Sequence, residues 1–113
     1  MKRIVAFIKP NMLSDVIQAL HEVSDFPGAA ISEVKGIGRG ISEHVKTSNH
    51  EPFHGMPHSV RLESICVDDM ADEIVKAIET NAHTGLPDDG KIYISPVDEA
   101  IRIRTGERGD PAV

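Results

Sequence analysis

Two stretches of the chain carry the same succession of hydrophobic and polar positions. Residues 4–8 are a mostly apolar, β-branched run, which is typical of a strand. Apolar residues at helical spacing follow and predict an amphipathic helix with Asn11 as its N-cap: Leu13, Val16, Ile17, Leu20 and Val23. Residues 25–28 (Asp-Phe-Pro-Gly) end this helix, and residues 30–37 alternate as a second strand.

The second half of the chain repeats this plan. Polar and apolar residues alternate from position 60 to 67, which predicts a third strand, and Asp68 and Asp69 offer an N-cap. A second apolar helical face follows, made of Met70, Ile74, Ala77 and Ile78. Residues 91–97 predict a fourth strand. Two strand–helix–strand units in series indicate an α+β, ferredoxin-like βαββαβ fold, and 113 residues suit a single domain over 1–113.

The segment between the two units, residues 38–58, has no sustained period of either kind. A loop of this length inside a small domain either serves a function or is disordered. It contains four histidines, His44, His50, His54 and His58. Imidazole is the commonest protein ligand for zinc and copper, so a metal site is one interpretation, and a polar loop that is merely rich in histidine is the other.

Composition narrows the class of protein. The net charge is −6, which argues against nucleic-acid binding. No apolar run approaches the ~20 residues that span a bilayer. The opening residues are too soon charged for a secretory signal, and the single Cys66 cannot form an intrachain disulfide. We therefore expect a cytoplasmic protein without membrane insertion, whose small core favours self-association.

Two polar segments are candidates for binding an anion. In residues 84–91, glycines allow backbone N–H groups to approach an anion, and Lys91 supplies a positive charge. Arg102 and Arg104 are two positions apart, so on a strand both side chains would face the same side. Two guanidinium groups on one face suit the oxygens of a phosphate. The alternative interpretation is a solvated turn and a charged edge strand.

Four segments in order along the chain resemble the P-II signal-transduction family. They are MKRI with IKP (residues 1–4 and 8–10), EVKGIGR (residues 33–39), TG followed by DGKIY (residues 84–85 and 89–93), and IRIRTGE (residues 101–107). The resemblance spans nearly the whole chain, and the last segment is similar to the family's C-terminal signature.

This resemblance implies a homotrimer with three clefts between subunits, each of which takes ATP or ADP. It also implies that residues 38–58 are the family's T-loop, which contacts a partner protein such as a transporter, an enzyme or a transcription regulator. Residues 84–91 would be the B-loop and residues 102–113 the C-terminal segment. The nucleotide-binding positions carried over from the family are Gly36, Ile37, Gly38, Arg39, Glu63, Ile65, Gly85, Asp88, Asp89, Gly90, Lys91, Arg102 and Arg104.

Three positions depart from the family pattern. Asp88 stands where the B-loop usually has glycine, and its carboxylate would repel terminal phosphates unless a metal ion such as Mg²⁺ sits between them. Ser59 holds the place of a phosphate-binding lysine, and Gly40 that of a glutamine which helps to hold magnesium and 2-oxoglutarate. We therefore doubt 2-oxoglutarate sensing and expect the preference among ATP, ADP and AMP to shift towards fewer phosphates.

The leading interpretation is a nucleotide-binding regulator that is not an enzyme. No Ser/His/Asp or Cys/His set with a plausible geometry and no Walker loop is present. One alternative is a metal-responsive sensor that binds zinc or copper on the histidine-rich loop, because some divergent P-II relatives look tied to heavy-metal efflux systems. Another is a slow ATPase.

Overall fold

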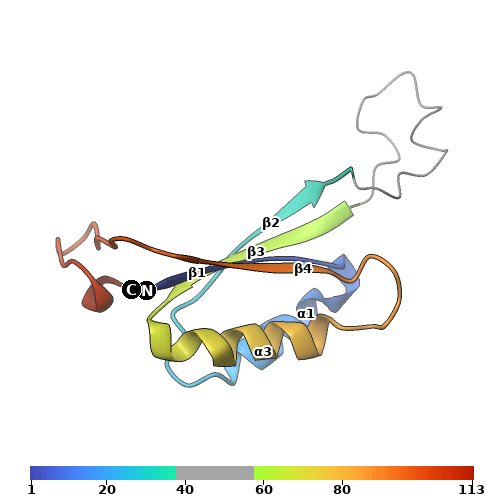
Figure 1. The fold of residues 1–113 in the computed structure, drawn as a ribbon, viewed down its shortest axis with the longest axis horizontal. Helices are drawn as coiled ribbons and strands as arrows, with labels where there is room; N and C mark the ends of the chain where they lie inside the picture. The colour runs from blue at the N-terminus through green and yellow to red at the C-terminus, as the bar shows by residue number, and fades with distance from the viewer. Residues whose placement is uncertain (38–57) are drawn as a thin grey trace.

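The computed structural model describes residues 1–37 and 58–113, which form one four-stranded sheet and two helices (Figure 1). The strands lie in the order β2-β3-β1-β4, and each neighbouring pair is antiparallel. This confirms the predicted ferredoxin-like arrangement. Along the chain the main elements are β1 (Lys2–Ile8), α1 (Leu13–His21), β2 (Ala30–Lys35), β3 (His58–Cys66), α3 (Ala71–Ala82) and β4 (Gly90–Pro96).

Both helices lie on the same face of the sheet and cover its two central strands (Figure 1). Alternate residues of β1 and β3, such as Ile4 and Leu62, point to this face and are fully buried. They pack against Val16 of α1 and Ile74 of α3, which are also fully buried. Cys66 is part of this core, as its place on the third predicted strand indicates. The period-2 and period-3.6 patterns therefore meet in one hydrophobic layer.

The first helix begins later than the capping prediction places it. Asn11 lies within a 3-10 turn, Pro10–Met12, and makes no capping contact; α1 starts at Leu13. The reason is that the backbone closes this turn by itself, because the Met12 N–H donates to the Lys9 carbonyl at 3.0 Å. The prediction of Asn11 as N-cap is therefore wrong.

The second helix shows the same local structure. The two predicted capping residues form a 3-10 turn, Asp68–Met70, in which the Met70 N–H donates to the Val67 carbonyl at 3.1 Å. α3 then starts at Ala71 without a side-chain cap, so this prediction is wrong as well. Asp72 and Glu73 lie in its first turn, where the helix dipole favours acidic residues.

The other face of the sheet carries no helix (Figure 1). Phe7 and Tyr93 meet there edge to face, with ring centroids 6.3 Å apart, and Tyr93 remains half exposed. Apolar side chains thus lie on an open surface of the single chain. Among the described residues, neither helix is long and apolar enough to cross a membrane.

The C-terminal segment folds back on itself beyond β4. Ile101 and Arg108 form a β-bridge, and the Gly106 N–H donates to the Arg102 carbonyl at 2.7 Å. Residues 102–106 are therefore a turn, and the prediction that Arg102 and Arg104 alternate along one strand is wrong. Gly106 has φ +77°, a left-handed conformation that glycine adopts readily and that reverses the chain here.

Candidate functional site

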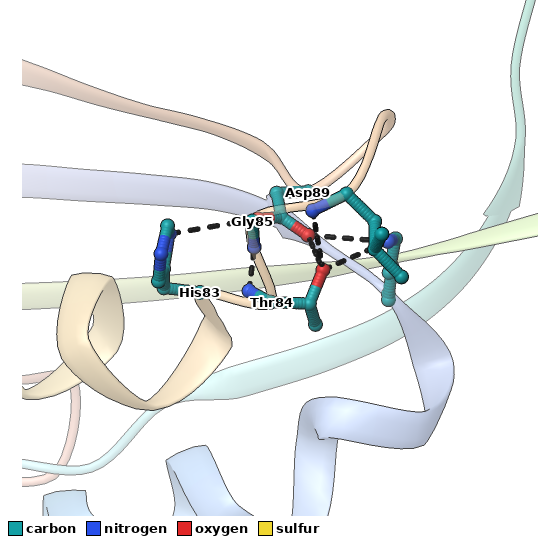
Figure 2. A network of polar contacts seen from close by, with 6 residues as sticks. His83, Thr84, Gly85 and Asp89 are labelled. Atoms are coloured by element: carbon teal, nitrogen blue, oxygen red, sulfur yellow. Dashed lines mark hydrogen bonds and ion pairs between the residues drawn. The ribbon is translucent and has the colours of Figure 1, made fainter.

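A single carboxylate organises the loop between α3 and β4. Asp89 Oδ2 accepts hydrogen bonds from the backbone N–H groups of Thr84 and Gly85, each at 2.9 Å (Figure 2). Asp89 Oδ1 accepts the Thr84 hydroxyl and lies 3.1 Å from Nζ of Lys9. Because both oxygens are engaged, Asp89 fixes the loop backbone from inside.

These contacts stabilise the charged form of the Asp89 carboxyl. The Thr84 hydroxyl and the backbone N–H groups of Thr84 and Gly85, with the Lys9 ammonium, hold the pKa of Asp89 well below its ordinary value. Lys9 follows β1 and is 80 positions away in sequence, so it joins the end of a central strand to the loop. Sequence reasoning missed this role of Lys9, for which only its place directly after the first strand gave a signal.

The end of the loop is fixed by close packing against β1. Gly90 has φ +105°, and a Cβ placed on it would lie 1.7 Å from the carbonyl oxygen of Phe7. No side chain fits in that space, so β4 must start with a glycine. Asp88, two residues earlier, is in the left-handed region with φ +69°, where most residues with side chains are strained.

A groove of about 580 Å³ opens beside this loop. We call it the B-loop groove, and it is lined among others by Lys9, Lys35, Gly36, Ile37, Asp88 and Gly90. Four of these six, Gly36, Ile37, Asp88 and Gly90, were predicted nucleotide-binding positions. Ser59 also lines the groove, and its hydroxyl donates to the Ile8 carbonyl at 3.2 Å. Two lysines and two glycines in this lining favour an anion, whereas the carboxylate of Asp88 opposes one.

The groove also touches both ends of the long segment between β2 and β3. Lys35, the last residue of β2, pairs with His58, the first residue of β3, and both line the groove. A ligand there would therefore lie against the two points at which residues 38–57 leave and rejoin the sheet.

A second hollow, of about 640 Å³, lies at the other end of the sheet. We call it the C-terminal hollow, and its lining includes Gly28, Ala30, Glu63, Ile65, Ala100 and Val113. Glu63 and Ile65 were predicted site residues. The stretch from Pro27 to Ala30 was missed, because in the sequence it reads only as the end of a helix and the start of a strand. Arg102 and Arg104 lie in the turn that follows Ala100.

The predicted site residues thus form two groups that one chain does not bring together. β4 runs from the B-loop groove to the C-terminal segment, and the two lie at opposite ends of the sheet (Figure 1). Its seven residues span on the order of 20 Å, several times the reach of a hydrogen bond. Each end therefore holds part of the predicted site.

Comparisons with known proteins show to which family a chain with these two half-sites belongs. A family model described as "Nitrogen regulatory protein P-II" matches residues 1–107. The chain belongs to the P-II family. Members of this family are signal-transduction regulators that act on partner proteins, so the regulatory part of the leading interpretation is confirmed at the level of the family.

Full-length relatives support the assignment to P-II. The "Nitrogen regulatory protein P-II" of Azospirillum brasilense is 40% identical over 113 residues, which is all of both chains. "Nitrogen regulatory protein P-II 2" of Methanothermobacter thermautotrophicus is 42% identical over 115 residues, all of this chain and 97% of the relative. The Haemophilus influenzae protein "Nitrogen regulatory protein P-II" is 38% identical over 113 residues, again all of both chains.

In this P-II chain Glu63 is engaged by two arginines on the open face of the sheet. Arg3 Nε lies 2.7 Å from one carboxylate oxygen, and Arg61 Nη2 lies 2.9 Å from the other. The hydrogen bond from Arg3, together with that from Arg61, holds the pKa of Glu63 below its ordinary value. A ligand in the C-terminal hollow would therefore meet a carboxylate whose oxygens already accept hydrogen bonds.

The remaining predicted positions divide between described and undescribed parts of the P-II chain. Lys91 lies opposite Phe7 on β4 and lines a depression against α3 instead of the B-loop groove. Gly38, Arg39, His44, His50 and His54 lie outside the described residues. His58 is exposed at the start of β3. Within residues 1–37 and 58–113, no group of three or more His, Cys, Asp or Glu side chains could hold a metal ion.

Proposed function

We propose that the protein is a homotrimeric regulator that binds an adenine nucleotide between neighbouring copies and passes this signal to a partner protein through residues 38–58. The observation that carries the proposal is the division of the site. The B-loop groove and the C-terminal arginines lie at opposite ends of the same sheet. A second copy that places its Arg102 and Arg104 beside the groove would complete an anion site.

The surface of the single chain supports association with further copies. Ile103 is 99% exposed, and Ile101 and Tyr93 are about half exposed. In a domain of this size, large apolar side chains that are this exposed favour self-association. The number of three copies follows from the P-II resemblance.

The place of the groove supports regulation. Because Lys35 and His58 line it, a bound nucleotide would contact both ends of the segment that the resemblance identifies as the T-loop. Binding would then favour one arrangement of this segment over another, which is the physical requirement for coupling the two sites.

Nucleotide binding is tested by isothermal titration of ATP, ADP and AMP into the wild type and into an Arg102→Ala, Arg104→Ala double variant. We expect binding by the wild type and its loss in the double variant. Arg108→Ala is the matched control, because Arg108 belongs to the same folded segment but pairs with Glu99 at 2.7 Å. Equal binding by all three proteins would contradict the proposed site. Sedimentation equilibrium on the same samples tests for the trimer.

The regulatory part is tested by limited trypsin digestion. Arg39 and Lys46 are the trypsin sites within residues 38–57. We expect a saturating nucleotide to change the cleavage rate at these two sites, as read by mass spectrometry. Unchanged cleavage rates with a nucleotide that does bind would contradict coupling to this segment.

A further inference from the structure

The B-loop holds two consecutive aspartates, and the structure gives them different roles. Asp89 turns into the loop and accepts hydrogen bonds from Thr84 and Gly85 (Figure 2). Asp88 is exposed and lines the B-loop groove. Within the described residues, the Asp88 carboxylate has no hydrogen-bonding or ion-pair partner.

The backbone around Asp88 is held in a defined conformation. Asp88 has φ +69°, and Asp is one of the few residues with a side chain that adopts this conformation at modest cost. Directly after the pair, Gly90 packs so closely against the Phe7 carbonyl that no side chain fits there. The chain is thus held directly after Asp88 by the hydrogen bonds of Asp89 and by the packing of Gly90.

The charges around the groove determine how strongly the Asp88 carboxylate acts on a bound anion. The cationic lining of the groove consists of Lys9 and Lys35. Lys9 lies 3.1 Å from Asp89, so its charge is already compensated inside the loop. Each further phosphate on a ligand that enters this groove therefore adds negative charge next to a fixed carboxylate.

We propose that Asp88 selects nucleotides by the number of their phosphates, so that this protein binds AMP and ADP in preference to ATP when no divalent cation is present. The inference rests on the proposed nucleotide site and assigns its specificity to one side chain. Excess Mg²⁺ reduces the discrimination, because a divalent cation neutralises much of the charge of the terminal phosphates.

The test is titration of AMP, ADP and ATP into the wild type, Asp88→Asn and Asp25→Asn, first with EDTA and then with excess Mg²⁺. Asn keeps the shape of Asp and tolerates the left-handed conformation, so Asp88→Asn removes the charge alone. Asp25→Asn is matched in charge and in backbone, because Asp25 has φ +59° but lines neither the groove nor the hollow.

In EDTA we expect Asp88→Asn to strengthen ATP binding relative to AMP by about tenfold, the effect of one unit charge partly screened by solvent. Asp25→Asn should leave the ratio of the two dissociation constants as in the wild type, and the effect of Asp88→Asn should shrink in Mg²⁺. The inference is overturned if nucleotides bind but the ratio is the same in all three proteins, or if Mg²⁺ leaves the difference unchanged. Failure of every nucleotide to bind any of the three proteins would instead overturn the proposed function.

Discussion

The close approach of Gly90 to β1 predicts an unusually large loss of stability for a glycine-to-alanine substitution. A Cβ at position 90 would lie 1.7 Å from the Phe7 carbonyl oxygen and 2.8 Å from its carbonyl carbon. Carbon and oxygen atoms in contact are separated by about 3.3 Å or more, so the start of β4 must move away from β1. That movement breaks the Ile8–Gly90 pair, which is the last residue pair of the β1–β4 ladder.

A second glycine separates this clash from the cost of the backbone conformation. Gly28 has the same φ of +105° as Gly90, but nothing lies within 4 Å of a Cβ placed on it. Gly28→Ala should therefore lose only the conformational term, about 1–2 kcal/mol. Gly90→Ala should lose this term and at least ~2 kcal/mol more, because ladder hydrogen bonds worth about 1 kcal/mol each break and the strand is displaced.

The assay is thermal and urea unfolding of the wild type, Gly28→Ala and Gly90→Ala, followed by circular dichroism. All samples must have the same protein concentration and no nucleotide, because association between copies and ligand binding both stabilise the folded state by mass action. We expect Gly90→Ala to melt ~10 °C or more below Gly28→Ala, from about 4–8 °C per kcal/mol for a domain near this size. Equal melting temperatures of the two variants would refute the reasoning, because they would mean that β4 relaxes away from Phe7 at no cost.

Three further predictions concern charge and assembly. Folding lowers the pKa of the Asp89 carboxyl, so this group stabilises the folded state above about pH 4 and the stabilisation is lost as the pH falls below that value. The difference in melting temperature between the wild type and Asp89→Asn should therefore shrink in acid. A difference that is constant with pH would contradict the contacts described. Glu63→Gln should lower the free energy of unfolding by no more than about 1 kcal/mol, because Arg3 and Arg61 are partly exposed. In urea titrations, high salt should make this loss smaller. A loss that salt does not change would argue against an electrostatic origin. Ile103→Ser should weaken self-association by about tenfold or more in sedimentation, because Ile103 is exposed in the single chain and would be buried between copies. An unchanged association constant would place Ile103 outside the contact between copies.

The elements of the fold follow from the sequence because each pattern reports a local property. Alternation in β1 and β3 and helical spacing in α3 are set by which side chains must be buried, and the structure buries the same ones, such as Leu62 and Ile74. Helix starts were less well predicted. Asn11 and Asp68 have good capping side chains, but backbone hydrogen bonds of the preceding 3-10 turns close these termini first.

The candidate site was only partly predictable, because its geometry depends on contacts between distant parts of the chain. The loop-organising role of Asp89 requires Lys9, which no local pattern connects to it. The share of Pro27 to Ala30 in the C-terminal hollow depends on where the chain end folds. The family resemblance places Arg102 and Gly90 in one set of site residues, whereas the sheet separates them by the length of β4.

The most direct test of the central claim, a nucleotide site completed by a second copy, is to mix two variants that each lack one half of it. Arg102→Ala, Arg104→Ala leaves the B-loop groove intact. Gly36→Phe fills that groove and leaves the arginines intact; a Cβ on Gly36 meets nothing within 4 Å, so the fold should tolerate the change.

Neither variant alone should bind nucleotide in isothermal titration. After the two are unfolded and refolded together, and mixed trimers are verified by native mass spectrometry, about a quarter of the clefts should combine an intact groove with intact arginines. The account predicts that binding returns at about that stoichiometry. Verified mixed trimers that bind no nucleotide would contradict it.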